Sequence, residues 1–183
     1  MPVIERLPPT TALIVVDVQT GTLPNARTVP ADDLLPRVKQ LIDAFRRSDR
    51  DVSFVVSSGT AAGATEYGPG GRVWPEGFAD LAPGIENRDD EPVYPRAGWS
   101  AFAGTPLARD FSMQQITDVV VVGLATTFGV ESTARAAADL GFNVTVVVDA
   151  VSDPDPAGHE RSVTRVFPAL GRVTTTQDLV GAL

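Results

Sequence analysis

The first candidate for chemistry is Asp17, which follows the apolar run ALIVV at positions 12–16. A carboxylate that ends a buried strand is partly withdrawn from water, and this raises its pKa. A raised pKa suits a carboxyl group to general acid or base catalysis near neutral pH. The competing interpretation is a buried aspartate that only caps a loop or a helix. Position alone leaves both open.

A second group of acids lies in the segment DAVSDPDPAGHE, which contains Asp149, Asp153, Asp155 and Glu160. Carboxylate oxygens at such spacing could surround a magnesium-type ion, or they could cap the helix that follows. The prolines and the glycine between them are typical of turns, which favours capping and predicts no metal site. The same segment holds His159, which we interpret as a structural hydrogen-bonding group rather than a catalyst.

The third feature is the stretch GLATTFGVESTA at 123–134, which leads from a predicted strand into a helix with a small-residue face. Backbone N–H groups at a helix start can bind a carboxylate or a developing oxyanion above the sheet. We therefore expect the N–H groups from Thr126 to Gly129 to face a ligand. Ordinary close packing of a helix on a sheet would select the same small residues.

Residues and motifs that the chain lacks exclude several kinds of chemistry. It has no cysteine, which excludes disulfides, thiolate metal sites and a cysteine nucleophile. It has one histidine, which excludes mechanisms that need two imidazoles. The first predicted strand leads into Asp-Val-Gln rather than a G-x-G-x-x-G loop, and no GK[ST] motif exists. We therefore expect no cofactor.

Composition and charge limit the class of protein. The 183 residues include 15 basic and 23 acidic side chains, a formal charge of −8, and 43% of them are hydrophobic. This composition is globular, and its negative charge disfavours nucleic acid and anionic membranes as partners. The start, MPVIERLPPT, has no signal-peptide pattern, and no apolar run reaches the roughly 18 residues of a membrane helix. We expect a soluble cytoplasmic protein with a single domain over residues 1–183.

The elements that must position these residues belong to an α/β fold. Short runs rich in Val and Ile alternate with helical patterns, which indicates a parallel sheet with helices on both faces. The predicted strands cover 12–18, 52–57, 118–123, 143–149 and 172–175, and the predicted helices cover 32–47, 130–140 and 157–170. We expect Pro168 to end or kink the last helix, and Lys39 to lie in solvent, off the apolar stripe of the first.

The stretch from 58 to 100 interrupts this alternation. It is rich in glycine and proline, and it contains Trp74, Tyr94 and Trp99. A long irregular segment inside a compact domain is usually functional or mobile. Since open parallel sheets bind ligands at the carboxyl ends of their strands, we expect this stretch to cover that edge.

Four blocks of sequence, in this order, resemble the isochorismatase-like (cysteine) hydrolase family over nearly the whole chain. They are ALIVVDVQ at 12–19, RAGWSAFAGTPL at 96–107, VVVVGLATTFGVESTARAAADLGFNVTVVVDAVSD at 119–153, and GHE at 158–160. The resemblance implies a six-stranded parallel sheet with helices on both faces, a three-layer Rossmann-like fold. It also implies a homodimer or homotetramer, and a cis peptide bond between Leu124 and Ala125.

The family's catalytic set is an aspartate, a lysine and a cysteine, and the resemblance implies that only the first is kept. The aspartate matches Asp17, whereas Arg96 stands at the lysine position and Gly129 at the cysteine position. Cleavage through a covalent acyl-thiol intermediate is thereby excluded. The nearest precedent is the isochorismatases, in which an aspartic acid protonates a vinyl ether and water completes the hydrolysis. Gly59 and Ala125 replace their substrate-binding glutamine and tyrosine, which speaks against isochorismate itself.

The sequence therefore predicts a hydrolase of a small, anionic molecule, with Asp17, Arg96 and Gly129 at the catalytic centre. Asp17 would act as acid or base, and Arg96 would hold a carboxylate or a developing oxyanion. The residues expected to bind the substrate are Gln19, Trp74, Trp99, Phe102, Ala125, Thr126, Thr127 and Phe128. One alternative is a catalytically reduced family member that binds a small molecule or a protein. Another is a phosphatase of the haloacid dehalogenase type, although its second acid and its lysine are missing.

Overall fold

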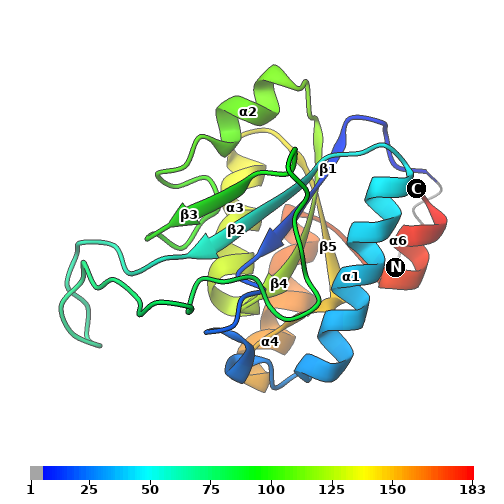
Figure 1. The fold of residues 1–183 in the computed structure, drawn as a ribbon. Helices are drawn as coiled ribbons and strands as arrows, with labels where there is room; N and C mark the ends of the chain where they lie inside the picture. The colour runs from blue at the N-terminus through cyan, green and yellow to red at the C-terminus, as the bar shows by residue number, and fades with distance from the viewer. Residues whose placement is uncertain (1–5) are drawn as a thin grey trace.

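A six-stranded parallel sheet forms the centre of the molecule, with the strand order β3-β2-β1-β4-β5-β6 (Figure 1). The computed structural model describes residues 6–183. The strands are β1 (Thr11–Val16), β2 (Val52–Ser57), β3 (Val93–Arg96), β4 (Asp118–Leu124), β5 (Asn143–Ser152) and β6 (Gly171–Thr174). The predicted fold, a parallel six-stranded α/β sheet with helices on both faces, is confirmed.

Helices lie in most of the connections between strands, and one helix follows the last strand. They are α1 (Ala31–Arg47), α2 (Leu107–Met113), α3 (Glu131–Asp139), α4 (Pro156–Arg161), α5 (Phe167–Leu170) and α6 (Thr176–Gly181). The short turn η1 (Leu23–Asn25) is a 3₁₀ helix, whereas η2 (Thr126–Val130) and η3 (Ser162–Val166) have the wider π geometry. Within the described part of the chain, none of these helices has the length and apolar character of a membrane span.

Both faces of the sheet are buried, because successive side chains of a strand point to opposite faces. On β1, Leu13 and Val15 pack with α1 and α6, whereas Ile14 and Val16 pack with α2 and α3. Figure 1 shows α1 and α6 together on one side of the sheet and α3 on the other. The uninterrupted apolar runs of the sequence follow from this double burial.

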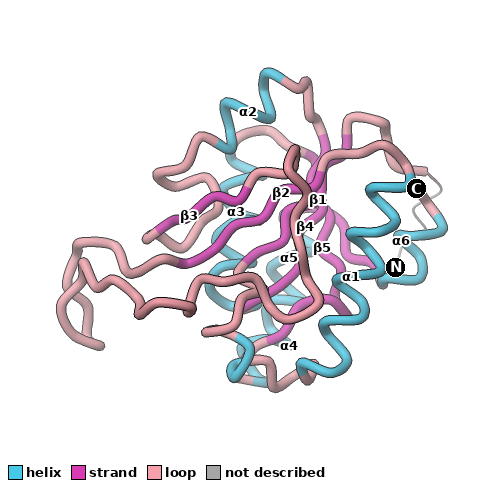
Figure 2. Tube along the Cα trace, viewed as in Figure 1, coloured by secondary structure: helices cyan, strands magenta, loops and turns pink. Residues whose placement is uncertain are grey.

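The irregular stretch contains one strand that the sequence did not indicate. β3 has only four residues, VYPR, and it forms the edge of the sheet beside β2. Pro95 cannot donate a backbone hydrogen bond, and an edge strand tolerates this because, within residues 6–183, its outer side pairs with no other strand. Between β2 and β3 the chain forms a long loop that extends beyond the sheet, drawn in pink in Figure 2.

The last predicted helix is present, but its middle is irregular. α4, η3 and α5 follow one another without a break from Pro156 to Leu170. The wide turn η3 lies directly ahead of Pro168, whose ring and missing N–H group prevent a regular helical turn there. The predicted kink is therefore a widened turn. Lys39 lies in solvent as expected, with its side chain 57% exposed. The helices α2 and α6 were not predicted.

Candidate active site

Three segments meet at the carboxyl edge of the sheet. They lie near the point between β1 and β4 at which the strand order along the chain changes direction. The chain builds from β1 to β2 and β3 on one side, and from β4 to β5 and β6 on the other. Asp17 follows β1, Arg96 ends β3, and η2 follows β4. Because all the strands are parallel, their carboxyl ends lie along one edge, which is the usual ligand site of an open α/β sheet.

Asp17 and Arg96 form a buried ion pair at this edge. Arg96 Nη2 donates a 2.7 Å hydrogen bond to Asp17 Oδ2, and the two residues are 4% and 7% exposed, respectively. Arg96 Nη1 donates to the carbonyl oxygen of Gly98. Asp17 Oδ1 and Arg96 Nε are also buried, yet within residues 6–183 neither has a hydrogen-bonding partner. A buried oxygen without a donor is a place for a proton or a ligand atom.

Burial raises the pKa of Asp17 from its ordinary value of 3.8 to about 6. The positive charge of Arg96, its hydrogen bond and the nearby backbone N–H group of Ser57 lower this pKa, but their combined effect is smaller than that of burial. Near pH 6 the carboxyl group is therefore populated in both protonation states. That is the condition under which a carboxyl group can serve as a general acid or base.

The backbone turns sharply at Asp17, where β1 ends. Its φ of 49° lies in the left-handed region, which residues other than glycine seldom adopt. Hydrogen bonds hold this conformation from both sides. Asp17 N donates to Val55 O at 2.8 Å, and Asp17 O accepts from Thr22 Oγ1 at 2.5 Å. The carboxyl group therefore has a fixed position at the end of the strand.

Gly129 lies against Arg96, and neighbouring atoms already occupy the space that a side chain at this position would need. A β-carbon built at Gly129 would lie 2.9 Å from Leu124 O, 3.0 Å from Arg96 Nη2 and 3.0 Å from Val16 Cγ1. These separations are too short for ordinary contact, so the neighbours would have to move. The guanidinium group of Arg96 thus lies directly against the glycine. The structure brings Asp17, Arg96 and Gly129 together, while their chemical roles stay a prediction.

The N–H groups of η2 are less available than the sequence suggested. Thr127 N and Oγ1 both donate to Asp153 Oδ2, at 2.7 and 2.8 Å. The N–H group of Phe128 donates to Ala125 O at 3.0 Å. The expectation that every N–H group from Thr126 to Gly129 faces a ligand is therefore wrong for these two. Their donors are used to fix the turn.

Two acids of the segment 149–160, Asp155 and Asp149, cap helices. Asp155 accepts hydrogen bonds from two N–H groups at the start of α4, and Asp149 accepts from the first residue of α6. His159 Nδ1 lies 2.9 Å from Thr126 Oγ1, which gives it a structural hydrogen bond. Across the described residues, no three histidine or carboxylate side chains group in a way that could hold a metal ion.

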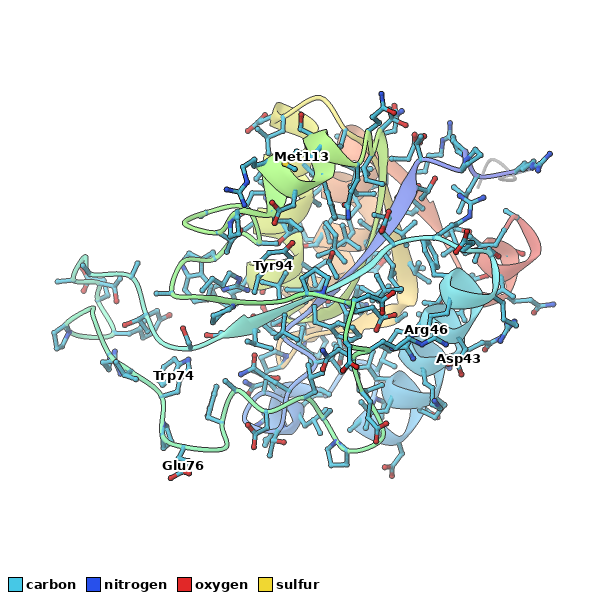
Figure 3. All side chains as sticks on the ribbon, turned by 45° about the horizontal axis from the view of Figure 1, so that its top comes forward. Asp43, Arg46, Trp74, Glu76, Tyr94 and Met113 are labelled. Carbon is cyan, nitrogen blue, oxygen red and sulfur yellow. The ribbon has the colours of Figure 1, made fainter. Side chains whose placement is uncertain are left out.

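Two recesses open beside Asp17, and Trp74 and Trp99 line both. The first has a volume of about 190 Å³ and is enclosed by residues of the loop 59–72. The second has a volume of about 390 Å³ and extends from Asp17 to η2. Trp99 stacks on Phe128 with 4.8 Å between ring centres. Figure 3 shows Trp74 on the loop that extends beyond the sheet. Both recesses therefore combine the charged Asp17 with the aromatic side chains of Trp74 and Trp99.

The predicted binding residues divide into those that line a recess and those that support it. The recesses are lined by Trp74, Trp99, Ala125 and Phe128, and the peptide bond before Ala125 is cis, as the resemblance implied. Gln19 is fully buried, and its amide bonds to the backbone of β2 and of the loop that follows. Thr126 and Thr127 lie outside the lining and are held by the hydrogen bonds described above.

Phe102 does not belong to the site, and its predicted place in the lining is wrong. Its ring packs against Phe111 and Phe142, with ring centres 6.4 and 5.7 Å apart, in the core on the α2 side of the sheet. The lining residues that the sequence reasoning missed include Ser57, Phe78 and Arg72. The position of Ser57 at the carboxyl end of β2 was a usable signal, because that edge carries the site. No comparable signal marks Phe78.

Comparison with known proteins agrees with this arrangement of strands. The isochorismatase domain profile matches residues 11–178. The chain belongs to the isochorismatase family. An uncharacterized isochorismatase family protein of Escherichia coli O157:H7 is 34% identical to it over 182 residues, covering 95% of this chain and 96% of that protein.

Other family members resemble the chain to a similar degree. An uncharacterized isochorismatase family protein of Bacillus subtilis (strain 168) is 32% identical over 178 residues, covering 93% of this chain and 92% of that one. A solved structure of an isochorismatase family protein from Burkholderia thailandensis has a TM-score of 0.91 and 33% identity, and it covers 98% of both chains. The match to the solved structure covers nearly the whole chain and therefore the sheet.

We predict that Asp153 stabilises the candidate site, since it accepts hydrogen bonds from η2, the turn that contains Gly129. Asp153 is fully buried, and its side chain accepts from Thr127 N, Thr127 Oγ1 and Asp155 N. Asp153→Ala would leave these donors unpaired, and we expect it to lower the free energy of unfolding by about 2–4 kcal/mol. Asp155→Ala, which removes a helix cap at an exposed residue, should cost about 1 kcal/mol. Urea unfolding compares the two, and equal losses would contradict the anchoring role.

Proposed function

We propose that this isochorismatase family protein hydrolyses a small anionic molecule by acid catalysis, without a covalent enzyme intermediate. The observation that carries the proposal is the Asp17 carboxyl group, buried at the floor of the two recesses with Oδ1 unpartnered within residues 6–183. A carboxyl group whose pKa is raised to about 6 can hold a proton near neutral pH and transfer it to a substrate.

The residues of the site suggest how one turnover would proceed. The proton on Asp17 passes to the substrate, for example to the terminal vinyl carbon of an enol ether, and leaves a carboxylate. Water then adds to the resulting cation to form a hemiketal, and one of its protons returns to Asp17. The C–O bond to the leaving group breaks as the hemiketal hydroxyl proton passes to the leaving oxygen, which releases a ketone and an alcohol. Arg96 lies 2.7 Å from Asp17 and stabilises the carboxylate during the step in which it is ionised.

Arg96 has a different role here from the one the sequence suggested. Its Nη2 donates to Asp17 and its Nη1 to Gly98 O, and its positive charge is compensated by the carboxylate of Asp17. We therefore assign Arg96 to Asp17 and not to a substrate carboxylate. Gly129 lets the guanidinium group reach this position, because a β-carbon there would lie 3.0 Å from Arg96 Nη2. The absence of cysteine from the chain supports a mechanism without a thiol ester.

A substrate panel tests this function. We would incubate the protein with small carboxylates that carry a vinyl ether, an ester or an amide, and follow the products by mass spectrometry. The proposal predicts turnover of a vinyl ether or a similarly acid-labile bond, no turnover of amides, and no covalent adduct on the 19.3 kDa chain. Amide cleavage with a trapped acyl adduct would overturn it. Saturable binding of panel compounds without turnover would favour the alternative of a binding module.

We also propose that the protein works in the cytoplasm as a homodimer or homotetramer. Large apolar side chains are exposed on the loop that extends from the sheet, with Tyr67 88% and Val73 84% exposed. Apolar surface of this kind often marks a protein–protein contact. Light scattering at micromolar concentration should give at least twice the chain mass of 19.3 kDa. A single species at 19.3 kDa would contradict the proposal.

A further inference from the structure

Because Arg96 is paired with Asp17, another group must bind the negatively charged part of a substrate. Of the charged side chains that line the first recess, Asp17 and Arg96 neutralise one another. Among the described residues, the remaining one is Arg72. Within the described residues, Arg72 forms no salt bridge, so its positive charge is not compensated by a carboxylate there.

Arg72 is held in place by the loop that carries it. Its Nε donates to Pro69 O and its Nη2 donates to Tyr67 O, each at 3.1 Å. Its backbone N donates to Thr60 Oγ1 at 3.0 Å. Nη1 makes no hydrogen bond to residues 6–183, which leaves one end of the guanidinium group for a ligand. A side chain that is already ordered loses little conformational entropy when it binds.

The loop itself is closely packed, and two glycines permit this. A β-carbon at Gly59 would lie 2.1 Å from Arg72 O, and one at Gly70 would lie 2.1 Å from Ala61 O. The two sides of the loop therefore approach as closely as backbone allows. Gly59 also forms an antiparallel bridge with Val73. The recess beneath the loop is thus formed before any ligand binds.

We propose that Arg72 is the anion-binding residue of this site and that it selects carboxylates with a flat, apolar body. The carboxylate would bind Arg72 Nη1, the apolar body would lie against Trp74 and Trp99, and the reacting atom would reach Asp17. The apolar character of the other lining residues favours an organic anion over inorganic phosphate or sulfate. This inference rests on the proposed function, because it names the substrate class of the same site.

The intrinsic tryptophan fluorescence of the chain can be used to measure ligand binding in this recess. It has only two tryptophans, Trp74 and Trp99, and both line the recess, so intrinsic fluorescence follows its occupancy. We would titrate the full chain with benzoate and with benzamide, which has the same shape without the charge. The wild type should bind benzoate about fivefold more tightly than benzamide, the gain expected for one partly exposed charge contact.

Three variants separate charge from structure. Arg72→Gln should abolish the preference for benzoate and leave benzamide affinity unchanged, whereas Arg72→Lys should keep the preference. Arg47→Gln removes an exposed arginine at the end of α1 and should change neither affinity. A benzoate preference that survives Arg72→Gln, or one that Arg72→Lys also abolishes, would overturn the proposal.

Collisional quenching provides a measurement that does not require tight binding. Iodide is an anion and acrylamide is neutral, so only iodide quenching of Trp74 and Trp99 should fall in Arg72→Gln. Equal iodide quenching in both proteins would contradict an anion-attracting recess. The outcome is separate from that of the proposed function. A charge preference without any Asp17-dependent turnover would refute the proposed hydrolysis but support anion binding by Arg72. Turnover without a charge preference would support the hydrolysis and refute anion binding by Arg72.

Discussion

Asp17→Asn is expected to lower kcat/KM by about 10²–10⁴-fold, the usual contribution of a positioned general acid or base. The asparagine side chain has nearly the same shape as aspartic acid, so the recess and the contact with Arg96 are kept. It cannot release a proton to a substrate. The wild-type rate should also depend on pH. Because the acid must be protonated in the free enzyme, activity should be highest below the Asp17 pKa of about 6 and fall above it.

Asp118→Asn is the matched control for this substitution. Asp118 is 7% exposed, as Asp17 is, but it lies at the start of β4, on the opposite edge of the sheet. We expect Asp118→Asn to leave kcat/KM within about twofold of wild type. Urea unfolding of both variants would show whether Asp17→Asn is still folded under assay conditions. An Asp17→Asn protein that is folded and fully active would refute the acid mechanism.

Gly129→Val is expected to abolish substrate binding and turnover, because the valine side chain needs the space that Arg96 occupies. Its β-carbon alone would lie 3.0 Å from Arg96 Nη2 and 2.9 Å from Leu124 O. Overpacking of this kind costs about 1–3 kcal/mol of stability. Displacement of Arg96 would also remove the charge that lowers the pKa of Asp17, so that pKa should rise further.

Gly181→Val is the control, since among residues 6–183, apart from the adjacent residues and the backbone of its own helix, no atom lies within 4 Å of a β-carbon at Gly181. It should keep ligand binding, measured by tryptophan fluorescence, and lose little stability. The same geometry predicts that Gly129→Cys creates no amidase by itself, because the thiol and Arg96 compete for one place. Gly129→Cys combined with Arg96→Lys would relieve this competition. Unchanged binding and turnover in Gly129→Val would mean that the pocket does not depend on this glycine.

The sheet was predictable because strands that are buried on both faces consist of apolar runs without alternation, and such runs are visible in the sequence. This identified β1, β2, β4 and β5 and placed Asp17 at a strand end. β3 left no such signal, since an edge strand of four residues can contain Pro95 and an exposed valine. Its end carries Arg96, which was therefore placed only through the family resemblance.

The side chains of the site were less predictable than the strands. Trp99 and Phe102 lie three positions apart in similar surroundings, yet one lines the recess and the other packs in the core. Local sequence cannot separate them, because the difference comes from the contact of Phe102 with Phe111 and Phe142. Arg72 was missed for a related reason. Only the folded loop brings it into the same recess as Asp17 and Arg96.

The protonation of Asp17 is the central claim, and a ¹³C NMR titration of its carboxyl carbon measures it directly. Asp17→Asn identifies the resonance, because only that signal should vanish from the spectrum. Burial beside Arg96 predicts a midpoint at pH of about 6, well above the ordinary value of 3.8. A midpoint at or below about 4, the range of an aspartate in water, would contradict the account. The carboxyl group would then be ionised throughout the working range and could not act as the acid.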